Sequence, residues 1–349
     1  MKPIKINGYE IMNGGSPFII AEAGVNHNGE IVKAFKMIET AKRLGTNAIK
    51  FQTFKAEELI ADPKLTYTYT SQNKKITESM LDMFKRYEFS KEEWFKIKQK
   101  CDAEKIIFLS SPSSKSDLKL LMEMGIKAIK VGSDDFTNIP LLKDCSKTDL
   151  PMILSSGMCN LEEIKTTINY LNKTTEYPII LLVCTSEYPT LIENVNLLKF
   201  ETLHDELKIP LGFSDHTQGS LASSLAVSMG ACVFEKHFTL DHNLPGPDHW
   251  FSEDPEGLRK WIDSIKKSYM MMGNRAIKPT VGEQKMKQIT RKSIVILENM
   301  EKDEIIDDKK IGIKRPGDGL PPKMFDQIMG KKATRNLIKN ELLKDGDYE

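Results

Sequence analysis

Ionisable side chains stand at the ends of several short apolar runs in this sequence. Glu22 follows the run FIIA, and Lys50 and Lys130 each end the tripeptide AIK. His216 follows LGFSD, and His237 follows VFEK. Apolar runs of this length are typical of buried strands, so these side chains would stand at strand ends. There, carboxylates, ammonium groups and imidazoles can perform acid–base chemistry, bind anions or hold a metal ion.

Glu22 is the candidate catalytic acid–base residue. A carboxylate at the end of an apolar strand has no packing role, and a nearby metal ion would hold it ionised and ready to act as a base. The structural alternative is an ion pair with Lys50 or Lys236. Asn26 and His27 lie in a glycine-bounded turn just after Glu22. They either join the site or only fix the shape of that turn.

Lys50 and Lys130 together predict a binding site for a small polyanion. Their ammonium groups would supply fixed positive charge, and serine hydroxyls and glycine-flanked backbone N–H groups would supply hydrogen-bond donors. A ligand that carries both a phosphate and a carboxylate fits such a site. Taken singly, each lysine could instead be a solvated surface charge.

His216 and His237 end neighbouring apolar runs, so their imidazoles could hold one divalent ion, with water and a substrate oxygen completing its coordination. The alternative is two histidines satisfied by hydrogen bonds in the core. Two imidazoles and at most one carboxylate suit a labile, open ion better than a closed structural zinc site. We expect Mn²⁺ foremost, with Mg²⁺ or Co²⁺ as the other candidates.

The elements that must position these residues repeat along the chain between Phe18 and Met272. Short β-branched or apolar runs alternate with helical patterns, as in parallel βα units. We count eight units, with strands expected at Phe18–Ala23, Ala48–Gln52, Ile106–Ser110, Ala128–Val131, Met152–Ser155, Ile179–Cys184, Leu211–Ser214 and Val233–His237. Eight units over about 250 residues predict a (β/α)8 TIM barrel, whose active sites lie at the C-terminal ends of the strands. The alternative is a doubly wound open sheet, which the lack of a glycine-rich dinucleotide fingerprint after the first strand disfavours.

Three further segments frame this repeat. Ile4–Ile11, with Asn7-Gly8 at its centre, predicts a β-hairpin that could plug the bottom of the barrel. Phe54–Arg86 is too long for an ordinary βα connection and is expected to lie over the site. After Met272 the chain becomes polar and turn-rich. We expect a barrel domain at residues 1–272, a linker at 273–285 and a small β-rich domain at 286–349, with strands at Lys292–Leu297 and near Ile311–Lys314.

The charge balance argues against nucleic acid or a membrane as a partner. The 50 Lys and Arg residues nearly cancel the 49 Asp and Glu residues, which leaves a net charge of +1. No apolar stretch approaches the roughly 20 residues of a membrane span, so a cytoplasmic protein is expected. The five cysteines lack CxxC spacing, and Cys184 and Cys232 lie in apolar runs, where we expect small buried hydrophobes.

Several longer motifs resemble the sialic acid synthase family, which includes N-acetylneuraminate, legionaminate and pseudaminate synthases. The resemblance covers nearly the whole chain. The motifs are AEAGVNHNG at 21–29, KFQTFKA at 50–56, FSDHT at 213–217, EKHFTLD at 235–241, PGPDH at 245–249 and KRPGDG at 314–319. The resemblance implies a TIM barrel followed by an antifreeze-like (SAF) domain, which covers the partner's active site in a domain-swapped homodimer.

The resemblance also implies a role for each candidate residue. His216 and His237 would hold Mn²⁺ or a similar ion, and Glu22 would be the acid–base residue. Phosphoenolpyruvate would be held by Lys50, Ser111, Lys130, Ser133, Ser155 and Ser186. The N-acetylated hexosamine would be contacted by Gln52, Asp135, Tyr188, Asp248 and, from the other subunit, Arg315. The chain departs from the family pattern at Ser113, at Asp134-Asp135 and at Ser186, which bears on the identity of the sugar.

The implied reaction condenses phosphoenolpyruvate with an N-acetylmannosamine-type sugar. The metal ion would polarise the aldehyde of the open-chain sugar, C3 of phosphoenolpyruvate would attack that aldehyde, and water would add at C2 with the help of Glu22. Phosphate would then leave by C–O cleavage, giving N-acetylneuraminate or legionaminate. Two alternatives remain open: a Schiff-base aldolase that uses Lys130 or Lys236, and a non-catalytic protein that binds carbohydrate or ice.

Overall fold

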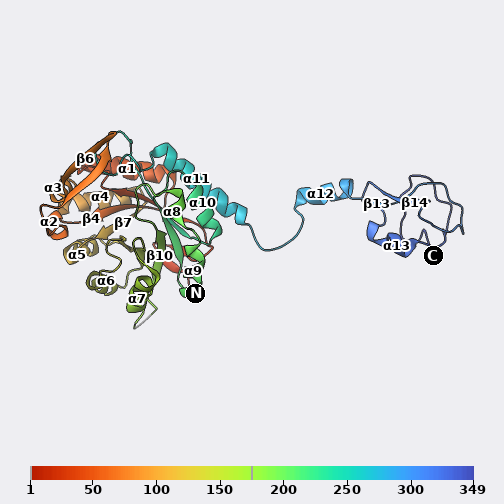
Figure 1. Cartoon of the computed structure of the whole chain (residues 1–349), viewed down its shortest axis with the longest axis horizontal. Coiled ribbons are helices and arrows are strands. Elements are labelled where there is room, and N and C mark those ends of the chain that lie inside the picture. Colours follow the sequence, from red (N-terminus) through yellow and green to blue (C-terminus); the bar gives the residue numbers. More distant parts are fainter. Residues whose placement is uncertain (1, 174–175) are drawn as a thin grey trace. The chain divides into compact units, whose positions relative to one another are not determined.

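The computed structural model describes residues 2–173 and 176–349 of the chain (Figure 1). Backbone contacts divide it into two compact units, Met1–Gly273 and Asn274–Glu349. The first unit contains the alternating strands and helices, and the second contains the short strands near the C-terminus.

Eight parallel strands form the sheet of the first unit, in the order β7-β4-β3-β12-β11-β10-β9-β8. Their bounds are β3 Phe18–Gly24, β4 Ala48–Thr53, β7 Ile107–Pro112, β8 Ile129–Val131, β9 Met152–Ser155, β10 Ile179–Cys184, β11 Leu211–Asp215 and β12 Val233–His237. The outermost strands of this order, β7 and β8, contact each other, so the sheet is a nearly closed barrel. The predicted (β/α)8 barrel is confirmed, and every observed strand overlaps the range expected for it.

Helices follow the strands and surround the sheet (Figure 1). The longer ones are α1 Ile31–Leu44, α4 Lys91–Ala103, α5 Lys115–Glu123, α6 Ile139–Ser146, α7 Leu161–Leu171, α9 Lys199–Glu206, α10 Leu221–Ser228 and α11 Pro255–Met272. The short helix α8 spans Ile192–Val195. Capping boxes begin α4 at Ser90 and α7 at Asn160, where the side chain of the glutamate three residues on bonds back to the cap.

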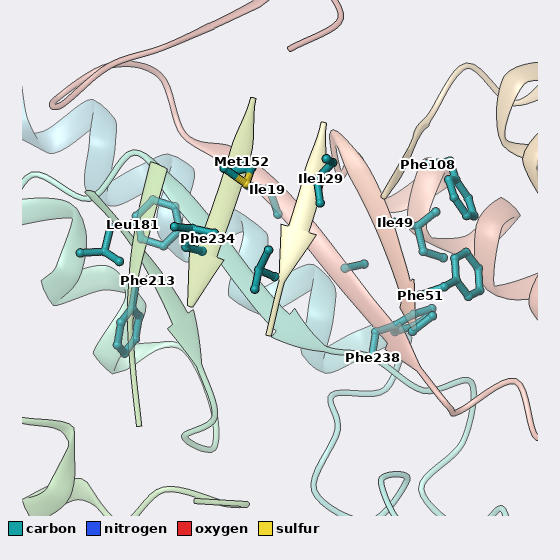
Figure 2. Packing of buried hydrophobic residues seen from close by; sticks show 14 of the residues in the cluster. Ile19, Ile49, Phe51, Phe108, Ile129, Met152, Leu181, Phe213, Phe234 and Phe238 are labelled. Atoms are coloured by element: carbon teal, nitrogen blue, oxygen red, sulfur yellow. The ribbon is translucent and has the colours of Figure 1, made fainter. Parts of the chain in front are cut away.

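Side chains of each barrel strand alternate between two buried faces, because successive residues of a strand point to opposite sides. One set packs outward under the helices (Figure 2): Ile19, Ile49, Phe51, Phe108, Ile129, Met152, Leu181, Phe213, Phe234 and Phe238. The other set fills the inside of the barrel and includes Phe18, Ile20 and Leu182. Both faces of each strand are therefore apolar, which explains the unbroken apolar runs in the sequence.

The N-terminal hairpin closes the end of the barrel at which the strands begin. Its strands are β1 Ile4–Ile6 and β2 Tyr9–Ile11, which pair antiparallel. Asn7 and Gly8 between them both have positive φ, as a tight hairpin turn requires. Ile4, Ile6 and Ile11 belong to the same buried cluster as the inward-facing residues of the barrel. Any opening for a ligand must therefore lie at the opposite end.

The long connection after β4 folds into α2 Ala56–Leu59, β5 Thr66–Ser71, β6 Lys74–Ser79 and α3 Met80–Lys85. Val25, Phe54, Met83 and Tyr87 form a small buried cluster beneath it. The end of the hairpin β5–β6 is tied to a later loop, since Gln72 Nε2 donates a 2.9 Å hydrogen bond to the carbonyl oxygen of Asn243. The expected long loop is thus an ordered element.

The second unit has its own buried core, which includes Ile294, Ile296, Ile306 and Leu337. Its elements are α12 Val281–Thr290, β13 Ser293–Ile296, β14 Ile311–Lys314, the 3-10 helix η1 Pro322–Met324 and α13 Phe325–Ile328. Residues 281–285, expected in a turn-rich linker, instead begin α12. The reason is a capping box: the side chain of Thr280 accepts from the backbone N–H of Glu283, whose carboxylate bonds back to Thr280 N.

Candidate active site

A cavity of about 380 Å³ opens at the ends of the barrel strands. Residues from all eight strands or the turns just after them line it, together with two loops. The predicted site residues that line it are Glu22, Lys50, Gln52, Ser111, Lys130, Ser133, Asp135, Ser155, Ser186, Tyr188, His216, His237 and Asp248. Arg315 belongs to the second unit, where it is exposed in the loop after β14.

Strand alternation explains why these side chains converge. Glu22 continues the inward series of Phe18 and Ile20, four and two residues earlier on β3. Lys50 follows the inward Ala48 by two residues, and Lys130 likewise follows Ala128. Each inward series is therefore apolar at the bottom of the barrel and ionisable at the open end.

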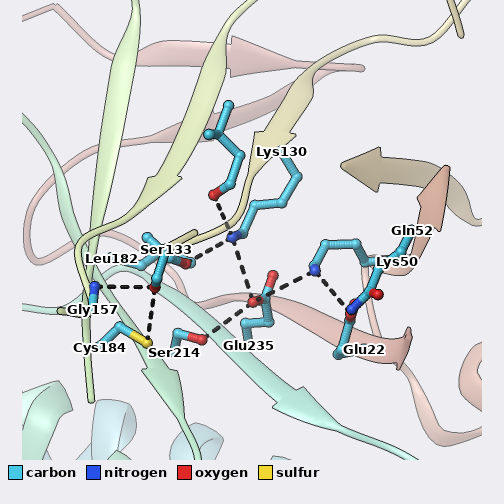
Figure 3. A network of polar contacts seen from close by, with 12 residues as sticks. Glu22, Lys50, Gln52, Lys130, Ser133, Gly157, Leu182, Cys184, Ser214 and Glu235 are labelled. Carbon is cyan, nitrogen blue, oxygen red and sulfur yellow. Dashed lines mark hydrogen bonds and ion pairs between the residues drawn. The ribbon is translucent and has the colours of Figure 1, made fainter. Parts of the chain in front are cut away.

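Two lysines and two glutamates form a buried network at the floor of the cavity (Figure 3). Lys50 Nζ lies 2.8 Å from Glu22 Oε1. Glu235 Oε1 lies between the two ammonium groups, 3.6 Å from Lys130 Nζ and 4.0 Å from Lys50 Nζ, and accepts a 3.2 Å hydrogen bond from Ser214. The Glu22–Lys50 pair matches the structural alternative for Glu22, but that carboxylate also faces the cavity.

Burial and the neighbouring charges shift the pKa values of these groups in different directions. Burial, reinforced by the nearby Glu235, raises the pKa of Glu22, although Lys50 opposes this. Burial opposes ionisation of Glu235, but Lys130 and Lys50 hold its pKa below the usual value. Burial and the like charge of Lys50 lower the pKa of Lys130. Glu22 is therefore the carboxylate of the network that takes up a proton more readily.

Hydroxyl groups and glycine surround Lys130. Its Nζ donates to Ser155 Oγ at 2.7 Å and to the carbonyl oxygen of Val131 at 3.0 Å. Ser133 Oγ accepts a 3.0 Å hydrogen bond from the backbone N–H of Gly157. A Cβ at residue 157 would come within 2.2 Å of Ser186 Oγ, so only glycine fits there. This arrangement keeps small donors close together beside a positive charge.

Five buried polar atoms in this region have no hydrogen-bond partner among the described residues. They are Glu22 Oε2, Ser111 Oγ, Ser186 Oγ, Glu235 Oε2 and His237 Nδ1. Leaving a buried polar group without a partner costs about 1–3 kcal/mol, so native proteins seldom tolerate it away from ligand sites. All five residues line the same cavity, which marks it as a place where a polar ligand binds.

The imidazoles of His216 and His237 face one another at the rim, with ring centroids 5.4 Å apart. His216 Nδ1 lies 2.8 Å from the carbonyl oxygen of Thr185, so Nδ1 carries a proton and Nε2 is the nitrogen that a metal ion would take. Burial opposes a charge on His216, but the neighbouring Cys184 raises the pKa of this imidazole, so a metal ion would have to displace the second proton. Burial and the neighbouring His216 lower the pKa of His237 well below its usual value, so His237 is the neutral form that binds metals.

These two histidines fit a divalent ion that keeps open positions. Among the described residues, no group of three or more His, Cys, Asp or Glu side chains is arranged to hold a metal. Asp248 Oδ2 lies 3.8 Å from the unpartnered Nδ1 of His237. Two imidazoles with water and substrate oxygens are the donor set of an exchangeable ion.

Cys184 is buried, as expected of a small hydrophobe, but it also lines the cavity. Its sulfur accepts a 3.6 Å hydrogen bond from Ser133 and lies 3.9 Å from His216 Nδ1. Burial opposes ionisation, but the neighbouring His216 lowers the pKa of the Cys184 thiol to about 7. Cys232 fits the expectation of a small buried hydrophobe, because it is buried and donates only to the carbonyl oxygen of Leu211.

Three other residues considered from the sequence do not line the cavity that the described residues form. Lys236 points to the outer face of the barrel, where its Nζ lies 3.2 Å from Asp215 Oδ2, so the idea of a Schiff base at Lys236 is wrong. Asn26 donates to the carbonyl oxygen of Phe238 and to Ser252, and His27 packs on the ring of Phe89. Both fix the turn after Glu22.

The sequence analysis missed Glu235 and an apolar wall. Strand alternation could have found Glu235, because it stands two residues after the inward Val233 and two before His237. The wall is contributed by the long connection after β4 and consists of Phe54, Leu59, Tyr67, Met80, Met83 and Phe84. The length of Phe54–Arg86 predicted that this segment lies over the site, but which of its side chains reach the cavity depends on how the segment folds back over the barrel.

The fold and the site together define a TIM barrel whose open end holds a buried cluster of lysines and glutamates beside two facing histidines. The chain belongs to the NeuB family, whose model matches residues 37–277, and a SAF domain matches residues 291–349. The chain is 38% identical over 339 residues to the N,N'-diacetyllegionaminic acid synthase of Legionella pneumophila, covering 95% of each. It is 40% identical over 332 residues to the enzyme of that name from Campylobacter jejuni, covering 94% of this chain and 98% of the relative.

A solved structure agrees with these similarities. The N-acetylneuraminic acid (sialic acid) synthetase of Leptospira borgpetersenii superimposes with a TM-score of 0.74 at 33% identity, over 82% of this chain and 95% of that one. The predicted family and the predicted SAF domain are confirmed. Among the described residues, no helix is both long enough and apolar enough to cross a membrane.

Proposed function

We propose that this protein condenses phosphoenolpyruvate with an N-acetylated mannosamine-type sugar to give a nonulosonic (sialic-type) acid and phosphate. The carrying observation is the buried network of Lys50, Glu22, Glu235 and Lys130, which lies beside unpartnered hydroxyls in one cavity. Membership of the NeuB family and similarity to two legionaminic acid synthases support the same reaction.

The donor substrate carries a phosphate and a carboxylate, and the network supplies charge for both. Lys130, with Ser155 and Ser133 beside it, would hold one anionic group. Lys50 would hold the other. The unpartnered hydroxyls of Ser111 and Ser186 would gain the acceptors that they lack in the free protein. Binding therefore exchanges internal ion pairs and unsatisfied groups for contacts with the ligand.

In the proposed reaction, C3 of phosphoenolpyruvate forms a bond with the aldehyde carbon of the sugar, and the aldehyde oxygen takes the electron pair of the C=O π bond and a proton to become a hydroxyl. Water then adds at the electron-deficient C2. Glu22, whose pKa is raised by burial, takes the proton of that water. The C2–O bond to phosphate breaks, and the leaving phosphate keeps the electron pair. Held by His216 and His237, a divalent ion, Mn²⁺ foremost, would polarise the aldehyde. The fixed charges of Lys50 and Lys130 would lower the activation barrier, because they are already in place and need not reorient as charge develops in the transition state.

Phosphate release decides the proposal. The full chain with Mn²⁺, phosphoenolpyruvate and an acceptor sugar should release one phosphate per nonulosonic acid, and ¹⁸O in the bridging C–O bond should appear in the phosphate. EDTA should abolish release, and added Mn²⁺ should restore it. Release of phosphate without any sugar, or full activity without a divalent ion, would contradict the reaction or the metal. No release with any sugar of the panel below would leave the carbohydrate- or ice-binding alternative.

We infer that the preferred acceptor is 2,4-diacetamido-2,4,6-trideoxymannose. The apolar wall faces a cavity whose floor is charged, so an acceptor with a polar aldehyde end and methyl groups at its far end fits best. The two legionaminic acid synthase relatives favour the same sugar. A methyl group in an apolar pocket is worth about 1–3 kcal/mol, so kcat/KM should exceed that for N-acetylmannosamine roughly ten-fold or more. The corresponding altrose sugar completes the panel, and equal kcat/KM values would contradict the preference.

We also propose a homodimer in which the partner supplies Arg315 to the sugar. Exposed apolar side chains on and before α12, namely Ile277, Val281, Met286 and Ile289, support a surface that another chain covers. Light scattering tests the dimer. Mixing inactive Glu22→Gln and Arg315→Ala chains tests the shared site, because exchange would rebuild one intact site per mixed dimer. A mixture no more active than either variant alone would contradict it.

A Schiff-base aldolase at Lys130 is the second candidate, because burial lowers the pKa of that amine. Lys130 Nζ is, however, fully engaged by Ser155, the Val131 carbonyl and Glu235. Borohydride in the presence of substrate would trap a covalent adduct at Lys130 if this candidate holds. The condensation reaction predicts no adduct.

A further inference from the structure

A second buried charge cluster lies on the outer face of the barrel, directly behind the two histidines. Asp215 precedes His216 on β11, and Lys236 precedes His237 on β12. The two strands pair in parallel with Asp215 opposite Lys236, and Lys236 Nζ lies 3.2 Å from Asp215 Oδ2. Asp215 is fully buried and Lys236 is 3% exposed. Since neighbouring residues of a strand point to opposite faces, the ion pair faces outward where the imidazoles face inward.

Asp215 is satisfied by a full set of donors. Its Oδ1 accepts from the backbone N–H of Thr217 at 2.9 Å and from Thr217 Oγ1 at 2.7 Å. Its Oδ2 accepts from Ser223 of α10 at 2.6 Å and from Trp261 of α11 at 3.2 Å. Lys236 also donates to the carbonyl oxygen of Thr217. The network therefore grips the residues on both sides of His216 and the residue before His237.

A gain in the free energy of unfolding does not explain why Asp215 and Lys236 form a buried ion pair at this position. The residues two positions earlier on the same outward face, Phe213 and Phe234, are apolar and pack under the helices. Desolvating two charges offsets most of their attraction, so well-packed apolar residues are often equally stable or better there. What an ion pair with fixed hydrogen bonds can supply is a specific register between two strand ends.

We propose that Asp215 and Lys236 are positioning residues that set the spacing of the imidazoles of His216 and His237 for one divalent cation. This inference rests on the metal site of the proposed function. Partners just outside the ligand shell orient the ligands, and their removal typically weakens metal affinity by about 10- to 100-fold. Loss of the clamp should therefore weaken metal binding without unfolding the barrel.

The test measures Mn²⁺ affinity of the full chain, from the electron paramagnetic resonance signal of free Mn²⁺. The double variant Asp215→Asn/Lys236→Met removes both charges of the pair at once. It leaves the partly exposed Glu253, 3.9 Å from Lys236 Nζ, with its hydrogen bond from the backbone N–H of Gly219. We expect its thermal melt to stay close to that of the unaltered protein and its Mn²⁺ affinity to fall roughly 10-fold or more. The matched control is Lys91→Met/Glu123→Gln, an exposed pair that joins α4 to α5 with atoms 2.5 Å apart, which should change neither value.

Asp215→Glu provides a second variant that keeps the charge and moves the carboxylate by one methylene. It should also lower Mn²⁺ affinity, and the phosphate release of both variants should recover as Mn²⁺ is raised to saturation. Unchanged affinity in a folded Asp215→Glu or double variant overturns the inference, as does an unaltered protein that binds no Mn²⁺. Phosphate release by the unaltered protein decides the proposed function separately.

Discussion

The buried polar groups on the two faces of β11 and β12 differ in how completely they are hydrogen-bonded. On the inner face, His237 Nδ1 and Glu235 Oε2 have no hydrogen-bond partner among the described residues. On the outer face, Asp215 accepts from Thr217, Ser223 and Trp261 and pairs with Lys236. The same strands thus hold an unsatisfied set and a satisfied set, separated by one residue of sequence.

The difference teaches that hydrogen-bond saturation, rather than burial or charge, separates a ligand site from a structural network. Unsatisfied buried groups are costly in the free protein and are retained where a ligand completes them. Saturated groups hold a geometry and leave nothing for a ligand to bind. By this criterion Glu235 and Asp215 are different kinds of residue, although both are buried carboxylates on barrel strands.

The largest expected effect comes from Glu22 on the inner face. Glu22→Gln should lower kcat for phosphate release about 10²- to 10⁴-fold, because the amide cannot accept the proton of water. Affinity for phosphoenolpyruvate, measured by calorimetry, should change little since Lys50 and Lys130 remain. Glu57→Gln, an exposed carboxylate of α2, is the control. An unaltered kcat would show that Glu22 serves only as the ion-pair partner of Lys50.

The next largest effect is expected at Glu235, whose carboxylate balances the charges of Lys130 and Lys50 before a ligand binds. Glu235→Gln removes the carboxylate between Lys130 and Lys50, and breaking such a buried pair should lower the free energy of unfolding by about 3–5 kcal/mol. Phosphoenolpyruvate should then stabilise the variant more than the unaltered protein, since its charges replace the missing one. Denaturant unfolding with and without phosphoenolpyruvate measures both. Equal stabilisation by the ligand would argue against this site for the anion.

Ser223 tests the outer face, where the expected effect is smaller. Ser223→Ala removes the 2.6 Å donor to Asp215 and the 2.8 Å acceptor of Trp261 Nε1, both buried. The free energy of unfolding should fall by about 1–3 kcal/mol. Affinity for phosphoenolpyruvate should not change, because the saturated network does not face the cavity. A lower affinity would break the distinction between the two faces.

The smallest effect is expected where charges are exposed. Lys91 and Glu123 form a 2.5 Å ion pair on the surface, with side chains that are 57% and 39% exposed. Solvent screens such pairs, so Lys91→Met/Glu123→Gln should leave the melting temperature and phosphate release unchanged within error. A measurable loss of stability would mean that this exposed pair stabilises the fold despite screening by solvent.

Much of the fold could be predicted from local patterns. The ranges expected for β9, β10 and β12 coincide with the observed ones. Strongly periodic apolar runs determine such elements because a strand or helix must bury them. Residues 281–285 are the exception, since a capping box began a helix where composition indicated a linker.

The sequence by itself determined the alternation that places Glu22, Lys50 and His237 at strand ends, together with the family motifs around them. Only the tertiary structure decided that Glu235 completes the charge network, that Lys236 pairs outward with Asp215, and that Tyr67 and Met80 reach the cavity. The physical reason is barrel closure. Closure fixes which face of each strand is the inside and brings together groups far apart along the chain, whereas local propensity depends only on neighbours in sequence.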